Sequence, residues 1–185
     1  MNHQLTGHRR GNITFAVIVL ALVFWLAAWP VAAESLTPSD REAVRKAAAA
    51  AKESFLKKDY DAFVALLYPE MIKAVGGKEK LVELLKAEDA RNAAAGLTVE
   101  SLVFEPTETV YLGTEFKLTF VSTTIIVKVG EARIESKSYY VAFTSLTGGP
   151  WYLLDGTRLS MTQFRSLFRG FPEDLKLPAV TKQKL

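Results

Sequence analysis

The sequence predicts an α+β fold: three N-terminal helices packed on one face of a strongly curved antiparallel sheet, in a cone-like arrangement, with a C-terminal helix and arm. Two observations favour it. Up to about residue 95, apolar residues recur at the three- and four-residue spacing of helices. From residue 97 they alternate with polar residues, and Gly- or Pro-containing turns separate the runs, which is typical of a meander of strands.

Residues 1–33 have the pattern of an export segment. Arg9 and Arg10 precede an uncharged apolar run of 17 residues at 13–29, and small residues at 31–33 suit a cleavage site. The run is slightly longer than the roughly 7–15 residues of a cleaved signal and at the lower limit of the roughly 17–25 that span a bilayer. We therefore expect a signal peptide or a retained membrane anchor. In either case we expect the rest of the chain to be exported across the inner membrane. It would be periplasmic or secreted, or would stay anchored by the N-terminal segment.

The charge of the rest of the chain is nearly balanced. Without Arg9 and Arg10, 21 Lys and Arg residues face 20 Asp and Glu residues, a net charge of about +1, and no basic block is present. We therefore expect no nucleic-acid partner. The remaining 152 residues suit one cone-like domain at 34–158 with a helix and extended tail at 159–185.

Cysteine is absent, and both histidines, His3 and His8, lie in the export segment. A processed chain therefore lacks thiol nucleophiles, histidine-based triads and His or Cys metal ligands. Acid–base chemistry would fall to Asp, Glu, Tyr or Lys. The sequence also contains no glycine-rich phosphate loop and no carboxylates at metal-ligand spacing, so we expect neither a metal nor a cofactor.

The first helix begins near residue 38. Ser39 with Glu42 forms a capping box, and Thr37-Pro38 offers an alternative start. The apolar stripe is mostly alanine, which allows the helix to lie close to the sheet. The stripe comprises Val44, Ala47, Ala48, Ala51 and Phe55.

Two more helices follow. Asp59 caps a short one, and Pro69 starts a further turn that the glycines at 76–77 end. The third covers residues 78–95 and stops at Gly96. The apolar faces of the second and third helices are formed by Phe63, Leu66 and Leu67 and by Leu81, Leu84 and Leu85, respectively.

Four or five strands are predicted, four of them at 97–104, 115–129, 133–145 and 151–155. The second alternates through Phe116, Leu118 and Phe120. It then loses phase, because Val121 follows directly. We expect a β-bulge between Val121 and Thr124 that restores the register and bends the strand.

Several segments resemble the nuclear transport factor 2-like superfamily, which includes the SnoaL and ketosteroid isomerase relatives. Residues 55–63 (Phe-Leu-Lys-Lys-Asp-Tyr-Asp-Ala-Phe) are similar to the junction of the first two helices in these proteins. Residues 68–70 (Tyr-Pro-Glu) and 76–79 (Gly-Gly-Lys-Glu) resemble the segment that follows. Trp151 stands where their last strand often carries an aromatic residue. The resemblance covers about residues 41–156.

The resemblance implies a pocket at the wide end of a cone formed by helices and sheet. Members of the superfamily include isomerases, polyketide cyclases, dehydratases and non-enzymatic binding or assembly domains, and dimers among them pair through the open sheet face. Fold alone does not choose among these functions, so the choice depends on the polar groups that face the pocket.

Two carboxylates are candidate catalytic groups. On the third helix, i+4 steps from the apolar stripe lead to Glu88 and Asn92, and burial would suit the Glu88 carboxyl to proton transfer. Asp155 ends the last strand and would act as a pocket acid in the manner of the isomerase relatives. The alternatives are a solvated helix end for Glu88 and a simple turn at Asp155-Gly156.

Aromatic and polar side chains are candidates for lining the pocket. Because Tyr139 and Tyr140 project to opposite faces of one strand, at most one of them lines it. The alternative is ordinary core packing. The candidate ligand-pocket residues are Tyr60, Tyr68, Asn92, Tyr111, Phe116, Phe120, Tyr139 and Trp151.

After the strands, Ser160 is the predicted cap of a C-terminal helix that ends at Gly170. Residues 175–178 would lie extended over the domain or against a second subunit, and 181–185 form a loose tail. The apolar face of this helix comprises Phe164, Leu167 and Phe168.

Taken together, these patterns predict an exported, non-catalytic module that binds a small apolar ligand or an envelope protein partner. One alternative is a cofactor-independent isomerase, cyclase or dehydratase that uses Glu88 or Asp155 with a tyrosine. Another is a structural subunit that forms homodimers through the open sheet face.

Overall fold

The computed structural model describes residues 34–157 and 159–185. The export segment predicted at 1–33, with its apolar run at 13–29, lies outside these ranges. Within them, no helix has both the length and the apolar composition needed to cross a membrane.

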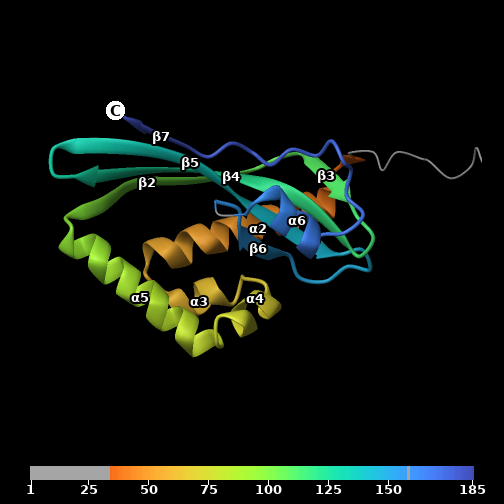
Figure 1. Ribbon diagram of the computed structural model, residues 1–185, viewed down its shortest axis with the longest axis horizontal. Coiled ribbons are helices and arrows are strands. Elements are labelled where there is room, and N and C mark those ends of the chain that lie inside the picture. The colour runs from red at the N-terminus through yellow and green to blue at the C-terminus, as the bar shows by residue number, and fades with distance from the viewer. Residues whose placement is uncertain (1–33, 158) are drawn as a thin grey trace, which may run out of the picture. The chain divides into compact units, whose positions relative to one another are not determined.

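The described residues form an α+β fold, as predicted, with helices ahead of most of the sheet (Figure 1). Among residues 34–96, four helices rather than three precede β2, because the turn predicted after Pro69 is itself a short helix. The helices are α2 (Pro38–Leu56), α3 (Tyr60–Val64), α4 (Pro69–Ala74), α5 (Lys78–Ala94) and α6 (Met161–Leu167).

Local capping signals set the starts of these helices. Thr37 caps α2, its side chain accepts a hydrogen bond from the first turn, and Pro38 opens the helix. The alternative start at Thr37-Pro38 is therefore confirmed, and the capping box predicted at Ser39 and Glu42 is wrong. Asp59 caps α3 through the same type of side-chain hydrogen bond, as predicted.

In the described residues, seven strands form one antiparallel sheet that is strongly curved but not closed. β4 pairs along its length with β5, and β2 and β3 pair with the other edge of β4. β6 and β7 lie on the outer edge of β5, and β1 pairs with β3. The strands are β1 (Glu34–Ser35), β2 (Leu97–Pro106), β3 (Thr109–Leu112), β4 (Phe116–Val129), β5 (Ala132–Ser145), β6 (Tyr152–Asp155) and β7 (Thr181–Lys184).

Both faces of the sheet are covered, by different parts of the chain. On one face, α2, α3 and α5 pack against Val121, Ala142 and Leu153 to form the helix-side core. On the other face, α6 and residues 168–178, here called the C-terminal arm, pack against Leu118 and its neighbours to form the arm-side core. The N-terminal helices α2, α3 and α5 therefore lie on one face, as predicted, and α6 lies on the second face.

This two-sided burial explains the change of phase in β4. The pairing of residues 116–129 with 132–145 is continuous, so the β-bulge predicted at 121–124 is wrong. Apolar residues at consecutive positions instead serve the two cores in turn, since neighbouring strand residues point to opposite faces. The register shifts in β2, between Val99 and Ser101.

The C-terminal arm lies directly on the sheet. Ser160 starts α6 with a capping box, and Leu175 is only 5% exposed in the arm-side core. A Cβ atom at Gly113 would lie 2.4 Å from a ring carbon of Phe171, so the arm approaches the backbone before β4 as closely as glycine allows. Residues 181–185 are not a loose tail, because β7 pairs with β5.

Candidate functional site

Most of the aromatic residues predicted to line a pocket are packed in the arm-side core. Their rings meet edge to face, with centroids 5.7 Å apart for Tyr111 and Phe120 and for Phe120 and Tyr139. Trp151 lies in the helix-side core, 7% exposed. The predicted residues that belong to the arm-side core or pack against it are Tyr68, Tyr111, Phe116, Phe120 and Tyr139.

Three other predicted residues, Tyr60, Glu88 and Asn92, come together in a cleft of about 410 Å³. The cleft lies where the end of α2, the start of α3 and the C-terminal half of α5 face the first residues of β2. Its lining is formed by Phe55, Leu56, Lys58, Tyr60, Leu85, Glu88, Asp89, Asn92, Ala93, Leu97, Thr98 and Val99.

The sharp turn between α2 and α3 brings polar groups to the cleft. Lys58 has φ 56°, a left-handed conformation that glycine adopts more readily. The Asp59 N–H donates to Ser54 O and the Lys58 N–H to Phe55 O, which is the hydrogen-bond pattern of a Schellman motif. The chain therefore reverses within two residues, and the Lys58 ammonium reaches Asp89 on α5 at 2.8 Å.

Asp89 is the carboxylate of the cleft that interacts with both Lys58 and Tyr60. The hydrogen bond from Lys58 lowers the pKa of the Asp89 carboxyl against a smaller opposing effect of burial, and the Tyr60 hydroxyl lowers it further. Burial, followed by the charge of Asp89, raises the pKa of Tyr60. At neutral pH the cleft thus presents an ionised carboxylate paired with an ammonium beside a neutral phenol.

The two predicted catalytic carboxylates have solvent-exposed settings. The Glu88 side chain is 57% exposed at the rim of the cleft and is paired with Arg91 of the same helix. The Asp155 side chain accepts a hydrogen bond from the Thr157 N–H at 2.8 Å, as expected for an Asp-Gly turn. Neither has the desolvated environment that tunes a carboxyl group for proton transfer.

Asp155 lines a second hollow, a recess of about 160 Å³ between β2, β4, β5 and the end of α2. Phe55 lines both the cleft and the recess, so the two adjoin. The recess is lined by Phe55, Leu102, Phe104, Thr123, Ile125, Ser138, Tyr140, Asp155 and Thr157.

Sequence reasoning missed Asp89 because it followed the wrong stripe of α5. Val82 is buried on this helix, whereas Leu84 is 46% exposed. A step of four residues from Leu84 leads to Glu88, and the same step from Leu85 leads to Asp89. A stripe that starts from Val82 and Leu85 would have identified Asp89.

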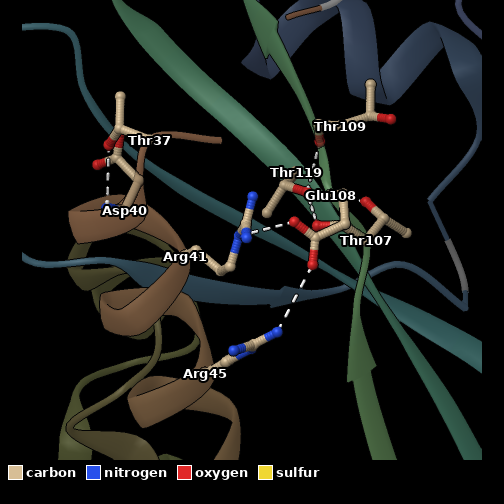
Figure 2. Close-up of polar contacts among 8 residues, drawn as sticks. All are labelled: Thr37, Asp40, Arg41, Arg45, Thr107, Glu108, Thr109 and Thr119. Carbon is tan, nitrogen blue, oxygen red and sulfur yellow. Dashed lines mark hydrogen bonds and ion pairs between the residues drawn. The ribbon is translucent and has the colours of Figure 1, made fainter. Parts of the chain in front are cut away.

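The polar groups at the other end of α2 have structural roles (Figure 2). Arg41 and Arg45 both extend from α2 to Glu108, at 2.7 and 3.6 Å. On β4, Thr119 donates a hydrogen bond to Thr109 O at 2.7 Å. These contacts fasten α2 and the start of β3 to the sheet.

The sequence matches no family model, and it matches no curated protein and no solved structure. The resemblance to the nuclear transport factor 2-like superfamily therefore stays a prediction. Among residues 34–157 and 159–185, no group of three or more carboxylates or imidazoles is placed to hold a metal ion.

Proposed function

We propose that this protein is a non-catalytic module that binds a small, mainly apolar ligand in the cleft between α2, α5 and β2. The observation that supports it is the composition of the cleft. Half-buried apolar side chains, among them Phe55, Leu85 and Val99, line it together with Lys58, Tyr60 and other polar groups. A volume of about 410 Å³ falls within the roughly 300–1,000 Å³ typical of small-molecule sites.

Binding fits these groups better than catalysis does. The charged residues of the cleft are used in pairs, Lys58 with Asp89 and Glu88 with Arg91. Such pairs orient a ligand at the rim but hold no carboxyl group ready for proton transfer. The pattern of residues 1–33 supports a site of action outside the cytoplasm.

The test is native mass spectrometry of the protein isolated from its own cells in the form that they produce. We expect a small molecule that remains bound in the native state and is released on denaturation. Leu85→Trp should abolish this retention, because the larger side chain fills the cleft. Leu84→Trp is the matched control, since Leu84 lies on the same helix but outside the cleft.

Two outcomes would contradict the proposal. One is a wild-type protein that carries no small molecule and binds none from an extract of its cells. The other is a ligand that Leu85→Trp retains as well as Leu84→Trp does, which would place the ligand elsewhere.

A further inference from the structure

The β4–β5 hairpin carries a strip of apolar side chains on its helix-side face. Side chains alternate between the two faces along β4, so Val127 points to the same face as Val121 of the helix-side core. Residues directly opposite in antiparallel strands also share a face, and Val99, Val127 and Ile134 therefore form one row across three strands. The apolar strip comprises Leu97, Val99, Ile125, Val127, Val129, Ala132 and Ile134.

The helices leave this strip uncovered. Among residues 34–157 and 159–185, neither core includes a residue of the apolar strip, and all seven of its side chains are half-buried. In Figure 1 the β4–β5 hairpin extends past the C-terminal end of α2, the helix that packs on the same face. A continuous apolar surface that the described chain does not cover is typical of a binding surface.

The apolar strip joins the cleft to two lysines on β7. Leu97 and Val99, at one side of the strip, also line the cleft. At the other side, Lys184 lies opposite Ile134, and Lys182 lies on the same face two residues earlier. Neighbouring strands are roughly 4.8 Å apart, so the row from Val99 to Lys184 is about 14 Å long.

The two lysines make this end of the strip positively charged. Neither forms an ion pair with a described residue. Glu135, the neighbouring carboxylate, points to the opposite face, where Gln183 donates a hydrogen bond to it. The lysines border a shallow hollow of about 320 Å³ whose described lining contains no carboxylate side chain: Ala132, Ile134, Lys182, Gln183 and Lys184.

We propose that the ligand is a fatty-acid-like anion, with its alkyl chain along the apolar strip and its carboxylate at Lys182 and Lys184. This inference rests on the proposed function and adds its ligand class, since the chain would continue into the cleft. Burial of the uncovered row favours an extended apolar chain, and two ammonium groups at its end favour an anion. The charged groups of the cleft are already paired with one another, so the lysines of β7 select the head group.

The test compares decanoate with 1-decanol, which have chains of equal length and differ in the charge of the head group. Each is titrated into the protein below the concentration at which it forms micelles. NMR methyl signals of Val127 and Ile134 report binding, with Ile72 of α4 as a signal outside the strip. The wild type should bind decanoate more tightly. Lys184→Gln should lower the ratio of the decanol Kd to the decanoate Kd by about 2- to 5-fold.

Matched variants on the opposite face of the hairpin serve as controls. Lys128→Gln removes the same charge there and should leave the ratio unchanged. Val127→Ser should weaken the binding of both ligands by about 5-fold or more, because it removes apolar surface from the strip. Ile126→Ser, at the next residue on the other face, should leave both affinities unchanged.

Three results would overturn this inference. They are equal wild-type affinity for the two ligands, a ratio that Lys184→Gln does not change, and signals of Val127 and Ile134 that do not move. The cleft proposal is judged separately, by ligand retention in Leu85→Trp. A retained ligand without an acidic head group would overturn this inference and leave the cleft proposal standing.

Discussion

The carboxylate of Asp40 stabilises the fold through an ion pair with Lys117. Its side chain is 16% exposed and accepts a hydrogen bond from Lys117 at 2.7 Å. Burial alone would raise the pKa of the Asp40 carboxyl, but the hydrogen bonds from Lys117 and Thr37 outweigh it and hold the pKa below its ordinary value. The Lys117 ammonium also lies 5.9 Å from the centre of the Trp151 ring. This group ties the start of α2 to β4.

Replacing Asp40 should therefore destabilise the protein in a pH-dependent way. At pH 7, Asp40→Asn should lower the free energy of unfolding by about 1.5–3 kcal/mol, because Lys117 loses a charge-assisted hydrogen bond. The folded pKa of Asp40 lies below the unfolded value near 3.8, so the stabilisation is present above that value and is lost as the pH falls through the folded pKa. Urea titrations between pH 7 and pH 2 measure it.

Glu53→Gln is the control for this effect, since Glu53 lies on the same helix in an exposed pair with Lys57. It should change stability little at any pH. An Asp40→Asn deficit that stays constant down to pH 2 would contradict the role assigned to the carboxylate.

At the scale of the element, most helix starts were predictable, but which face of a helix or strand packs inward was not. Caps depend on residues a few positions apart, and Asp59 and Ser160 therefore mark α3 and α6 correctly. Which stripe of α5 faces inward depends on the helices and strands around it, so Leu84 was wrongly chosen over Val82. The same limitation produced the expected bulge in β4, because the sequence before β6 gives no sign that an arm covers the second face.

β7 adds four residues to the edge of β5 without burying a side chain. Ending the chain after Val180 should lower the free energy of unfolding by no more than about 1–2 kcal/mol, since mainly backbone hydrogen bonds are lost. Amides at 134–137 should then exchange with deuterium much faster than in the full chain. Hydrogen exchange read by mass spectrometry checks this.

Lys182→Ala is the matched control, because it removes an exposed side chain and keeps the backbone pairing. Its exchange pattern should equal that of the wild type. Faster exchange spread over the whole of β4 and β5 after truncation would show that β7 supports the entire sheet.

At the scale of the whole domain, the two cores share the β4–β5 hairpin. Residues 34–185 contain a single tryptophan, Trp151, in the helix-side core, whereas Phe164 is fully buried in the arm-side core. Because neighbouring residues of the same strands serve both cores, loss of one core should weaken the other. The described chain should therefore unfold as one cooperative unit.

Phe164→Ala tests this coupling. It should lower the free energy of unfolding by about 3–5 kcal/mol, because Phe164 is 0% exposed. Circular dichroism and Trp151 fluorescence of the processed chain should report the same shifted midpoint. Leu167→Ala, in the same helix at 50% exposed, should have a small effect. Two separate midpoints in Phe164→Ala would mean that the cores unfold independently.

The candidate site was predictable only in part. The sequence placed Tyr60, Glu88 and Asn92 in a pocket, and the structure brings these three to one cleft. It missed Asp89, because the apolar stripe followed on α5 ran through Leu84 rather than Val82. The sequence patterns that predict a fold or an export segment involve many residues close together in the chain. A site depends on a few residues brought together from distant segments.

The two sides of the arm-side core are also synthesised at different times, because the arm follows the sheet in the sequence. Phe164 and Leu175 are synthesised after Phe120 and Phe143 on the sheet. Until the arm is synthesised, the aromatic face of β4 and β5 lacks the cover that Phe164, Phe168 and Leu175 give it. A growing chain therefore offers chaperones a surface that the finished protein hides.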